Sequence, residues 1–412
     1  PRSTLSSSSA ASDVYKRQLI NSITSTKILK TSSIFRSAPL LPENAPSSWR
    51  KVFLNCAALI ETDLNPVELL SSLQEIERKM GRQRGERWSP RTVDIDIISF
   101  GSENVEQPNL TIPHPEALKR NFVLSPLCEI CPDLTINGKT ILEHKRALPS
   151  QLSSWMQIVN VTPDSFSGDG LLQTDRRDSI SPSHIPNYFD IGGESTRPGA
   201  KTLTTSEEWD RLEKILLSFD TQSWFRPKVS LDTRNALTAA KAVDLGIDLI
   251  NDVSGLGDPE MLEVIKSGEV DIVVMHNLGI PANPKQTIPD KENPVETVTR
   301  FFNEKLETLD KEGISKARVL IDPGIGFGKT ANHSWQLLQN IDQLNHLGVR
   351  IMVGHSRKSF LKEITAAEPE DRDVHTIAIS QQLEKKGVDV IRVHNLEAHY
   401  HFLESVWRMA SQ

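Results

Sequence analysis

Three short segments near the carboxyl end of the chain carry residues that could hold a flat heterocycle and an anion. They are DPGIGFGK (322–329), GHSRKSF (354–360) and RVH (392–394). Each follows a short, β-branched apolar run that is typical of a buried strand. A carboxylate can accept paired hydrogen bonds from a heterocycle, and fixed cations beside free backbone N–H groups can bind an anion. The pattern therefore indicates an enzyme site.

Two further polar residues end apolar runs in the same half of the chain. Asp232 and Asn251 stand where Asp322 stands, directly after or at the close of such a run. One such residue alone is most often the cap of the next helix. Three of them meeting at one place can instead pair with the amidine-like edge of a heterocycle.

Cations in this half are spaced to hold a diphosphate. Arg392 and His394 are two residues apart on one expected strand, so their side chains lie on the same face. Arg197 and Lys358 add two more charges. A solvated surface is the ordinary interpretation of any one of these residues, but the SRK segment opens an expected helix, where backbone N–H groups favour an anion.

Regularly spaced elements must position these residues. Eight apolar runs typical of strands occupy 157–161, 188–191, 228–231, 247–250, 271–275, 318–321, 349–353 and 388–393. Most intervals leave room for a helix, as in 294–312 and 373–386. We predict an α/β fold in which residues 154–412 form a (β/α)8 TIM barrel, with its active site at the carboxyl ends of the strands.

In the first half of the chain the expected strands and helices are less regularly spaced. Residues 52–59 and 93–100 are expected strands, and Pro66–Lys79 is an expected helix with Val67, Leu70, Leu73 and Ile76 along its apolar stripe. We predict a compact α+β domain over residues 19–146, followed by a polar linker at 147–153.

Residues 1–18 are Ser-rich and show no apolar periodicity. We expect a disordered or non-native leader, with an organelle transit peptide as the alternative. The expected location is the cytoplasm, or an organelle if the leader directs import.

The bulk composition excludes some classes of protein. A formal net charge of −7 argues against a nucleic-acid partner, and no apolar run reaches the ~18 residues of a membrane span. Cys128 and Cys131 form a lone CxxC without further zinc ligands at matching spacing, and Cys56 is the third cysteine. This sparse, odd count suits a reducing compartment.

Two carboxylates in the first half are spaced to bind a metal. Asp94 and Asp96 occupy one face of an expected strand, which suits a shared Mg2+ on the phosphates of a nucleotide, although a polar edge strand is the alternative. Basic residues and an aromatic plane lie just upstream: Arg82, Arg84, Arg87, Trp88 and Arg91. Together they favour a metal–nucleotide site.

The second half resembles dihydropteroate synthase. The matching segments, in order, are NVTPDSFS, DIGGESTRPGA, SLDT, INDVSG, DPGIGFGK, SRKSF and RVH, from about residue 154 to the carboxyl end. The resemblance implies that 6-hydroxymethyl-7,8-dihydropterin diphosphate condenses with para-aminobenzoate to give 7,8-dihydropteroate and pyrophosphate.

The resemblance also implies a role for each matching residue. Those that would hold the pterin are Asp232, Asn251, Met275, Asp322 and Lys358, the last of which also counts as catalytic. Those around para-aminobenzoate would be Phe166, Thr196, Pro198 and Ser356. Asn160 would bind Mg2+ on the diphosphate, which Arg197, Arg392 and His394 would grip. The departures are the loop order SFSGDG, His355 in place of a small residue and a short first crossover at 171–187.

The first half resembles 6-hydroxymethyl-dihydropterin pyrophosphokinase, which transfers diphosphate from ATP to the pterin alcohol and leaves AMP. The matching segments are SSIFRSAPL, FLNCAALIET, GRQRGERWSPRTVDIDII and IPHPEALKRNFVLSPLCEICPDL. The resemblance implies that Asp94 and Asp96 bind Mg2+ and act in catalysis with Arg82 and Arg91. Arg84, Arg91, His114 and Arg120 would bind the nucleotide, and Asn55, Trp88 and Phe122 the pterin.

One departure in this half is large. The family opens with a strand and a Gly-Ser-Asn turn, and the match here begins near residue 19. We therefore expect a ferredoxin-like α+β domain that lacks its first strand, because a sheet without a central strand exposes unpaired backbone. Kinase activity is expected to be compromised.

Three alternatives stay open. The first half could be a non-catalytic structural cap, the barrel could be a corrinoid-linked pterin methyltransferase, or the whole chain could bind pterins without catalysis. The STRPG and SRKSF segments argue against the methyltransferase. The expected partners are pterin diphosphate, para-aminobenzoate and ATP, with Mg2+, and a second copy of the chain in a homodimer. Neither nucleic acid nor a membrane is expected.

Overall fold

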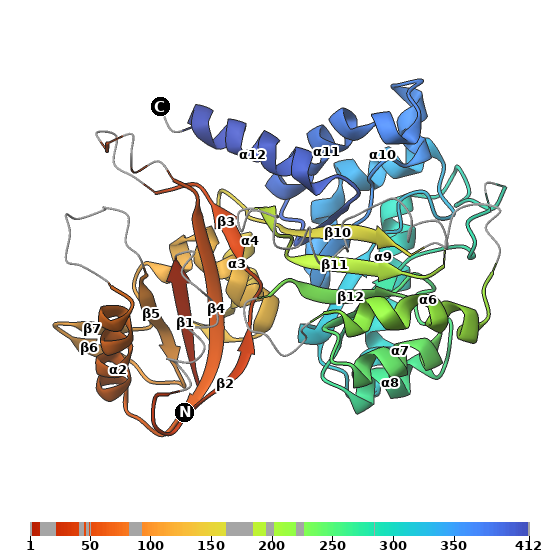
Figure 1. Ribbon diagram of the computed structural model, residues 1–412. Helices are drawn as coiled ribbons and strands as arrows, with labels where there is room; N and C mark the ends of the chain where they lie inside the picture. The colour runs from red at the N-terminus through yellow and green to blue at the C-terminus, as the bar shows by residue number, and fades with distance from the viewer. Residues whose placement is uncertain are drawn as a thin grey trace.

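Figure 1 shows an α+β domain beside a barrel surrounded by helices. This computed structural model describes residues 2–8 (backbone only), 22–40, 45–46, 49, 51–81, 93–161, 184–194, 202–219, 226–283 and 285–410. Among the helices of these residues, none is long and apolar enough to cross a membrane.

The amino-terminal domain is built on a five-stranded sheet of order β2-β4-β1-β5, with β3 paired to β4. Its strands are β1 (Arg2–Ser8), β2 (Thr26–Thr31), β3 (Phe35–Ser37), β4 (Phe53–Thr62) and β5 (Ile95–Phe100). Its helices are α2 (Pro66–Lys79), α3 (Asn121–Ile130) and α4 (Ile141–Arg146). Two short hairpins complete it: β6 (Val105–Gln107) with β7 (Leu110–Ile112), and β8 (Thr135–Ile136) with β9 (Lys139–Thr140).

The strand β1 corrects the expectation for the start of the chain. Residues 2–8 lie inside the predicted leader, yet their backbone pairs antiparallel with both β4 and β5, so the sheet does not lack this strand. Ladder bonds use backbone N–H and C=O groups, which a Ser-rich segment carries as well as an apolar one. Hydrophobic periodicity therefore gave no sign of it.

Helices cover both faces of this sheet. Neighbouring residues of β4 point to opposite sides, so that Ala58 and Ile60 pack against α2 whereas Ala57 packs against α3. The helix α2 begins and ends as predicted, with the capping box of Asn65 at its start. Its buried stripe differs from the prediction at one position: Val67 is exposed and Leu69 is fully buried, while Leu70 packs partly buried against the same core as Leu73 and Ile76. The sheet to which the helix docks selects this face.

The second domain is a closed barrel of eight parallel strands, as predicted. The strands are β10 (Ser154–Asn160), β11 (Tyr188–Gly192), β12 (Lys228–Asp232), β13 (Leu249–Asp252), β14 (Asp271–Met275), β15 (Val319–Asp322), β16 (Arg350–Val353) and β17 (Val390–Val393). Each overlaps its predicted run. Pairing between β10 and β17 closes the barrel.

Helices surround the barrel (Figure 1). They are α6 (Thr205–Leu217), α7 (Ala236–Asp244), α8 (Met261–Ser267), α9 (Pro294–Lys311), α10 (Ala331–Gln339), α11 (Asp373–Lys385) and α12 (Leu396–Ala410). The interior is packed rather than open, and is filled by Met156, Tyr188, Leu249, Val273, Leu320, Met352 and Val390. The predicted first crossover at 171–187 falls mostly outside the described residues.

The amino-terminal domain packs against the amino-terminal ends of the barrel strands. Lys145 of α4 forms an ion pair of 2.5 Å with Asp389, which directly precedes β17, and both side chains are almost fully buried. Asn187, which precedes β11, donates from Nδ2 to Ser33 Oγ over 2.8 Å. Arg146 donates to Val349 O over 2.6 Å. The two domains thus share buried polar contacts.

Candidate active site

The polar residues predicted for the barrel gather at the carboxyl ends of its strands. Asp232, Met275 and Asp322 are the last residues of β12, β14 and β15, and Asn160 is the last residue of β10. Asn251 lies on β13 and pairs in register with Asp232. Parallel strands of a closed barrel end at one face, so these side chains share one mouth.

Asp190, which we did not predict as a site residue, lies at the centre of this group. Its side chain is fully buried on β11. It accepts hydrogen bonds from Ser230 Oγ at 2.6 Å, Asn251 Nδ2 at 3.1 Å and Arg392 Nε at 2.5 Å. Asp190 lies in the segment DIGGEST, but its position in the alternating pattern of the strand is that of any inward-facing residue, so the sequence did not single it out.

Arg392 joins Asp190 to the neighbouring acid Asp232. Its Nη2 donates to Asp232 Oδ2 over 2.7 Å. Burial raises the pKa of Asp232 to about 7, and the Arg392 guanidinium opposes that rise. A cation and an acid that were predicted to bind different parts of the substrate are therefore in direct contact.

The glycine-rich segment after β15 turns sharply beside β14. Gly324 has a φ of +65°, and a Cβ there would lie 1.9 Å from His276 O, so only glycine fits. Its N–H donates to Asp322 Oδ1 over 2.8 Å, which fixes the carboxylate at the mouth. Burial raises the pKa of Asp322, and Lys358 opposes the rise. Lys329 Nζ lies 2.8 Å from His276 Nδ1, and this contact links the glycine-rich segment to the residue that follows β14.

Lys358 reaches this segment from the loop after β16. Its Nζ donates to Ile325 O over 2.6 Å and lies 4.8 Å from the centre of the Phe327 ring. Burial lowers the pKa of Lys358 to about 8, and Asp322 opposes the fall. Phe327 is a second residue that we did not predict, although an aromatic residue inside a glycine-rich segment was a visible signal.

The SRK loop is held by the helix α11. Arg357 has a φ of +61° and forms a two-bond ion pair with Asp373, at 2.7 and 2.8 Å. The Arg357 N–H donates to Thr376 Oγ1 over 3.2 Å. Ser356 Oγ lies 3.0 Å from His394 Nδ1, which brings the loop to the end of β17. The expected helix after SRK is a 3-10 helix at Ser359–Glu363.

Comparisons with known proteins agree with this geometry. Residues 156–394 match the family model described as pterin binding enzyme, and residues 5–132 match that of 7,8-dihydro-6-hydroxymethylpterin-pyrophosphokinase. The folate synthesis bifunctional protein of Chlamydia muridarum is 33% identical over 90% of this chain and 89% of its own length. The chain belongs to the bifunctional folate synthesis proteins. It is an enzyme that fuses a pyrophosphokinase domain to a dihydropteroate synthase barrel.

Solved synthases have the same barrel. The dihydropteroate synthase of Anaplasma phagocytophilum, with bound 6-hydroxymethylpterin-monophosphate, is 32% identical with a TM-score of 0.56, over 63% of this chain and 99% of its own. That of Xanthomonas albilineans, with 4-aminobenzoic acid, is 33% identical with a TM-score of 0.53, over 63% and 93%. The predicted barrel and both families are thus confirmed for this bifunctional folate synthesis protein, and the kinase half is an α+β domain that, contrary to the prediction, contains the strand β1. Kinase activity stays a prediction.

In the kinase domain of this folate synthesis protein, the described site residues come from several elements. Asp94 and Asp96 flank the buried Ile95 at the start of β5, which agrees with their predicted common face. Arg120 precedes α3, and its guanidinium lies 5.9 Å from the centre of the Phe122 ring. His114 follows β7, and its Nδ1 accepts a hydrogen bond of 3.2 Å from the Glu116 N–H.

Asn55, which we predicted to hold the pterin, also lies in the described part of this domain. It is buried on β4, and its Nδ2 donates to Ser37 Oγ over 2.9 Å. Eight further predicted residues lie outside the described part of the chain: Arg82, Arg84, Trp88, Arg91, Phe166, Thr196, Arg197 and Pro198.

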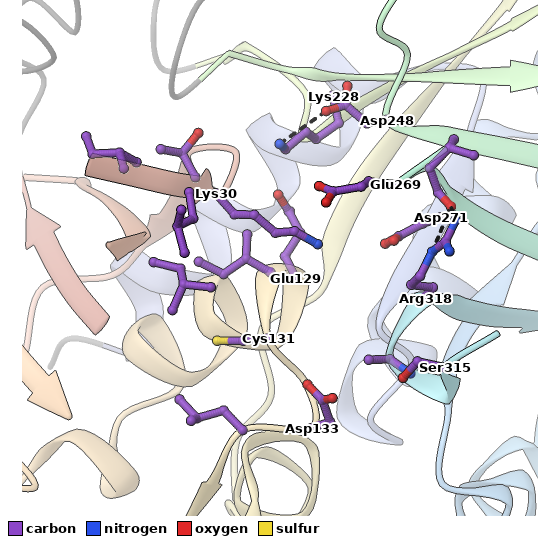
Figure 2. Close-up of a pocket in the computed structure, with 18 of the residues that line it drawn as sticks. Lys30, Glu129, Cys131, Asp133, Lys228, Asp248, Glu269, Asp271, Ser315 and Arg318 are labelled. Carbon is purple, nitrogen blue, oxygen red and sulfur yellow. Dashed lines mark hydrogen bonds and ion pairs between the residues drawn. The ribbon is translucent and has the colours of Figure 1, made fainter. Parts of the chain in front are cut away.

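A cavity of about 1280 Å3 between the two domains is not part of either site. Figure 2 shows Lys30, Glu129 and Cys131 facing Lys228 and Asp248 across it. It lies at the amino-terminal ends of the barrel strands, where residues of such barrels serve stability. Lys228 Nζ lies 3.2 Å from Asp248 Oδ1, so these two charges satisfy one another.

Proposed function

We propose that the barrel condenses 6-hydroxymethyl-7,8-dihydropterin diphosphate with para-aminobenzoate to give 7,8-dihydropteroate and pyrophosphate. The observation that carries this proposal is the meeting of Asn251, Asp322 and Lys358 with Arg392 at one mouth. The amide and the acid hold the pterin ring, next to Asp232 and Met275. Arg392 and His394 hold the diphosphate and stabilise the charge that develops on it as it leaves.

The remaining predicted residues complete this site. Ser356 Oγ lies 3.0 Å from His394 Nδ1, and this distance supports a para-aminobenzoate site beside the leaving diphosphate. Phe166, Thr196, Arg197 and Pro198 are proposed for the same two substrates on the strength of their motifs alone. Asn160 offers an amide oxygen at the end of β10, which is a ligand type that Mg2+ accepts.

We further propose that the kinase domain transfers diphosphate from ATP to the pterin alcohol. Asp94 and Asp96 provide hard oxygen ligands, so they would hold Mg2+, which would neutralise phosphate charge. No group of three or more histidine, cysteine or acidic side chains placed to bind a metal occurs among the described residues. The phosphates of ATP would complete the coordination. Arg82, Arg84, Arg91, His114 and Arg120 would bind those phosphates, and Asn55, Trp88 and Phe122 the pterin.

The first experiment measures both products from one preparation. Formation of AMP from ATP, Mg2+ and 6-hydroxymethyl-7,8-dihydropterin supports an active kinase domain, and its loss in Asp94→Asn/Asp96→Asn excludes a contaminating kinase. Formation of dihydropteroate from supplied pterin diphosphate and para-aminobenzoate supports the synthase. Absence of dihydropteroate from folded protein would refute the proposed barrel reaction.

A second role for the kinase domain has an observation of its own. The polar contacts of Lys145, Arg146 and Ser33 with the barrel, of which those of Lys145 and Ser33 are buried, make this domain part of the barrel's support. Absence of AMP in the first experiment, with dihydropteroate still formed, would leave this structural role as the function of the domain.

The pKa of Lys358 predicts how synthase activity depends on pH. A lysine is charged below its pKa, so the cation is present below about pH 8 and is lost above it. We expect kcat/KM for pterin diphosphate to fall about tenfold per pH unit above that value. Lys358→Arg should be less active but keep its charge, and should lack this alkaline fall. Since the substrate titrates alike in both proteins, identical alkaline limbs would contradict the role of Lys358.

We also propose an assembly and a cellular location. A homodimer through the barrel helices is expected from the family, and sedimentation velocity tests it. Cys56, Cys128 and Cys131 are free thiols in buried positions, which supports a reducing compartment such as the cytoplasm. The absence of nucleic-acid and membrane partners stays a prediction from charge and composition.

A further inference from the structure

The carboxylate of Asp190 joins three strands of the synthase barrel from a fully buried position. Its Oδ1 accepts from Ser230 on β12, and its Oδ2 accepts from both Asn251 on β13 and Arg392 on β17. An ionised carboxylate can only accept hydrogen bonds. Each neighbour must therefore turn a donor toward it.

This requirement fixes the orientation of the Asn251 amide. With Nδ2 directed at Asp190, the amide oxygen must point the other way. That oxygen, Oδ1, is buried and has no hydrogen-bond partner among the described residues. A buried acceptor without a partner raises the free energy of the folded protein, and a hydrogen bond from a ligand would remove this cost. The exocyclic amine and ring N–H groups of a pterin are donors of that kind.

The same carboxylate oxygen sets the guanidinium of Arg392. Nε is directed at Asp190 over 2.5 Å and Nη2 at Asp232 over 2.7 Å. Both nitrogens belong to one rigid, planar guanidinium, so the two hydrogen bonds together fix its plane. Asp190 thus orients two groups of the site: the Arg392 guanidinium, which is proposed to bind the diphosphate, and the Asn251 amide, which is proposed to bind the pterin ring.

We propose that Asp190 is a positioning residue of the synthase, which orients Asn251 for the pterin ring and Arg392 for the diphosphate through one carboxylate. This inference rests on the proposed function of the barrel. Asp190 itself touches neither substrate in the proposal and acts through its two neighbours.

Two variants of the full chain test the proposal. Asp190→Ala removes the acceptor, and we expect about a 100-fold loss of kcat/KM for pterin diphosphate, the effect typical of a misplaced binding group. Asp190→Asn keeps an oxygen at the position of Oδ2, which faces both Asn251 and Arg392, while its NH2 faces Ser230 Oγ. It should therefore restore most of the inhibition of dihydropteroate formation by 6-hydroxymethylpterin and by pyrophosphate. KM for para-aminobenzoate should change less than about threefold in both variants.

The outcomes separate this inference from the function on which it rests. Folded wild-type protein that forms no dihydropteroate would refute the proposed function and the inference with it. A working wild type with unchanged kcat/KM in Asp190→Ala would refute only the positioning role. Equal losses of affinity for 6-hydroxymethylpterin, pyrophosphate and para-aminobenzoate in both variants would also overturn the positioning role. General damage to the barrel would weaken the binding of all three alike.

A further variant covers the case in which Asp190→Ala does not fold. Asn251→Asp places a second carboxyl group opposite Asp190, and this group can donate a hydrogen bond only when it is protonated. Relative to the wild type, inhibition of dihydropteroate formation by 6-hydroxymethylpterin should strengthen as pH falls. A pH dependence identical to that of the wild type would show that Asp190 does not dictate the donor at position 251.

Discussion

Asp322→Ala is expected to lower kcat/KM of the synthase reaction at least about 100-fold, since loss of a fixed charged partner at a reacting site typically has this effect. The carboxylate is buried at the end of β15, and Gly324 fixes one of its oxygens. Alanine removes both the acceptor for the pterin and the negative charge beside Lys358. Initial rates of dihydropteroate formation from supplied pterin diphosphate measure the loss.

The matched control is Asp342→Ala, which removes an aspartate from the exposed ion pair with Lys386. We expect it to leave kcat/KM unchanged. Thermal unfolding of both variants shows whether the barrel remains folded, because Asp322 also helps to hold the turn at Gly324. Full activity of folded Asp322→Ala would refute its assignment to the pterin.

Lys145→Met is expected to lower the free energy of unfolding by about 3–5 kcal/mol, the usual cost of leaving a buried charge without its partner. The Nζ of Lys145 lies 2.5 Å from Asp389 Oδ1, and the two side chains are 3% and 5% exposed. Arg146, at 3.8 Å, lies too far from Asp389 to replace the lost hydrogen bond. Unfolding in denaturant measures the change in the free energy of unfolding. The temperature at which synthase activity is lost reports separately on the stability of the barrel.

Lys119→Met provides a control in the same domain. Lys119 pairs with Glu116 at 3.0 Å, but both side chains are exposed. We therefore expect a loss of less than about 1 kcal/mol. If the two variants were destabilised equally, the contact between α4 and the barrel would not have the importance proposed for it.

The barrel was predictable because its pattern repeats. Eight short, β-branched runs separated by helix-length intervals indicate one architecture, and each run overlaps an observed strand. The residues that end those runs, such as Asp232 and Asp322, could be assigned to one mouth before any coordinates, since parallel strands end at the same face.

The sheet of the kinase domain contains a strand that the sequence pattern does not predict. Residues 2–8 pair with β4 and β5 through their backbone, although their side chains gave no apolar alternation. Backbone hydrogen bonding is shared by all residues except proline, so it leaves no trace in composition. A strand that joins a sheet in this way is found only when its neighbours are known.

The supporting residues of the site were missed for a different reason. Asp190 is important because β12, β13 and β17 each direct a donor at it, and these strands are far apart in the sequence. The contact of Lys145 with Asp389 likewise joins residues from different domains. Spacing along the chain describes only one element at a time, so convergence of this kind appears only in three dimensions.

The attachment of the kinase domain to the amino-terminal ends of the barrel strands has a consequence for traffic between the two halves. The synthase residues lie at the other end of those strands, and the part of β5 that lines the inter-domain cavity is its end at Ser99, not its start beside Asp94. A product formed beside Asp94, as proposed, would be released away from this cavity and would have to diffuse through bulk water to reach the barrel mouth. Fusion of the two domains would then secure equal numbers of two catalysts rather than direct transfer between them.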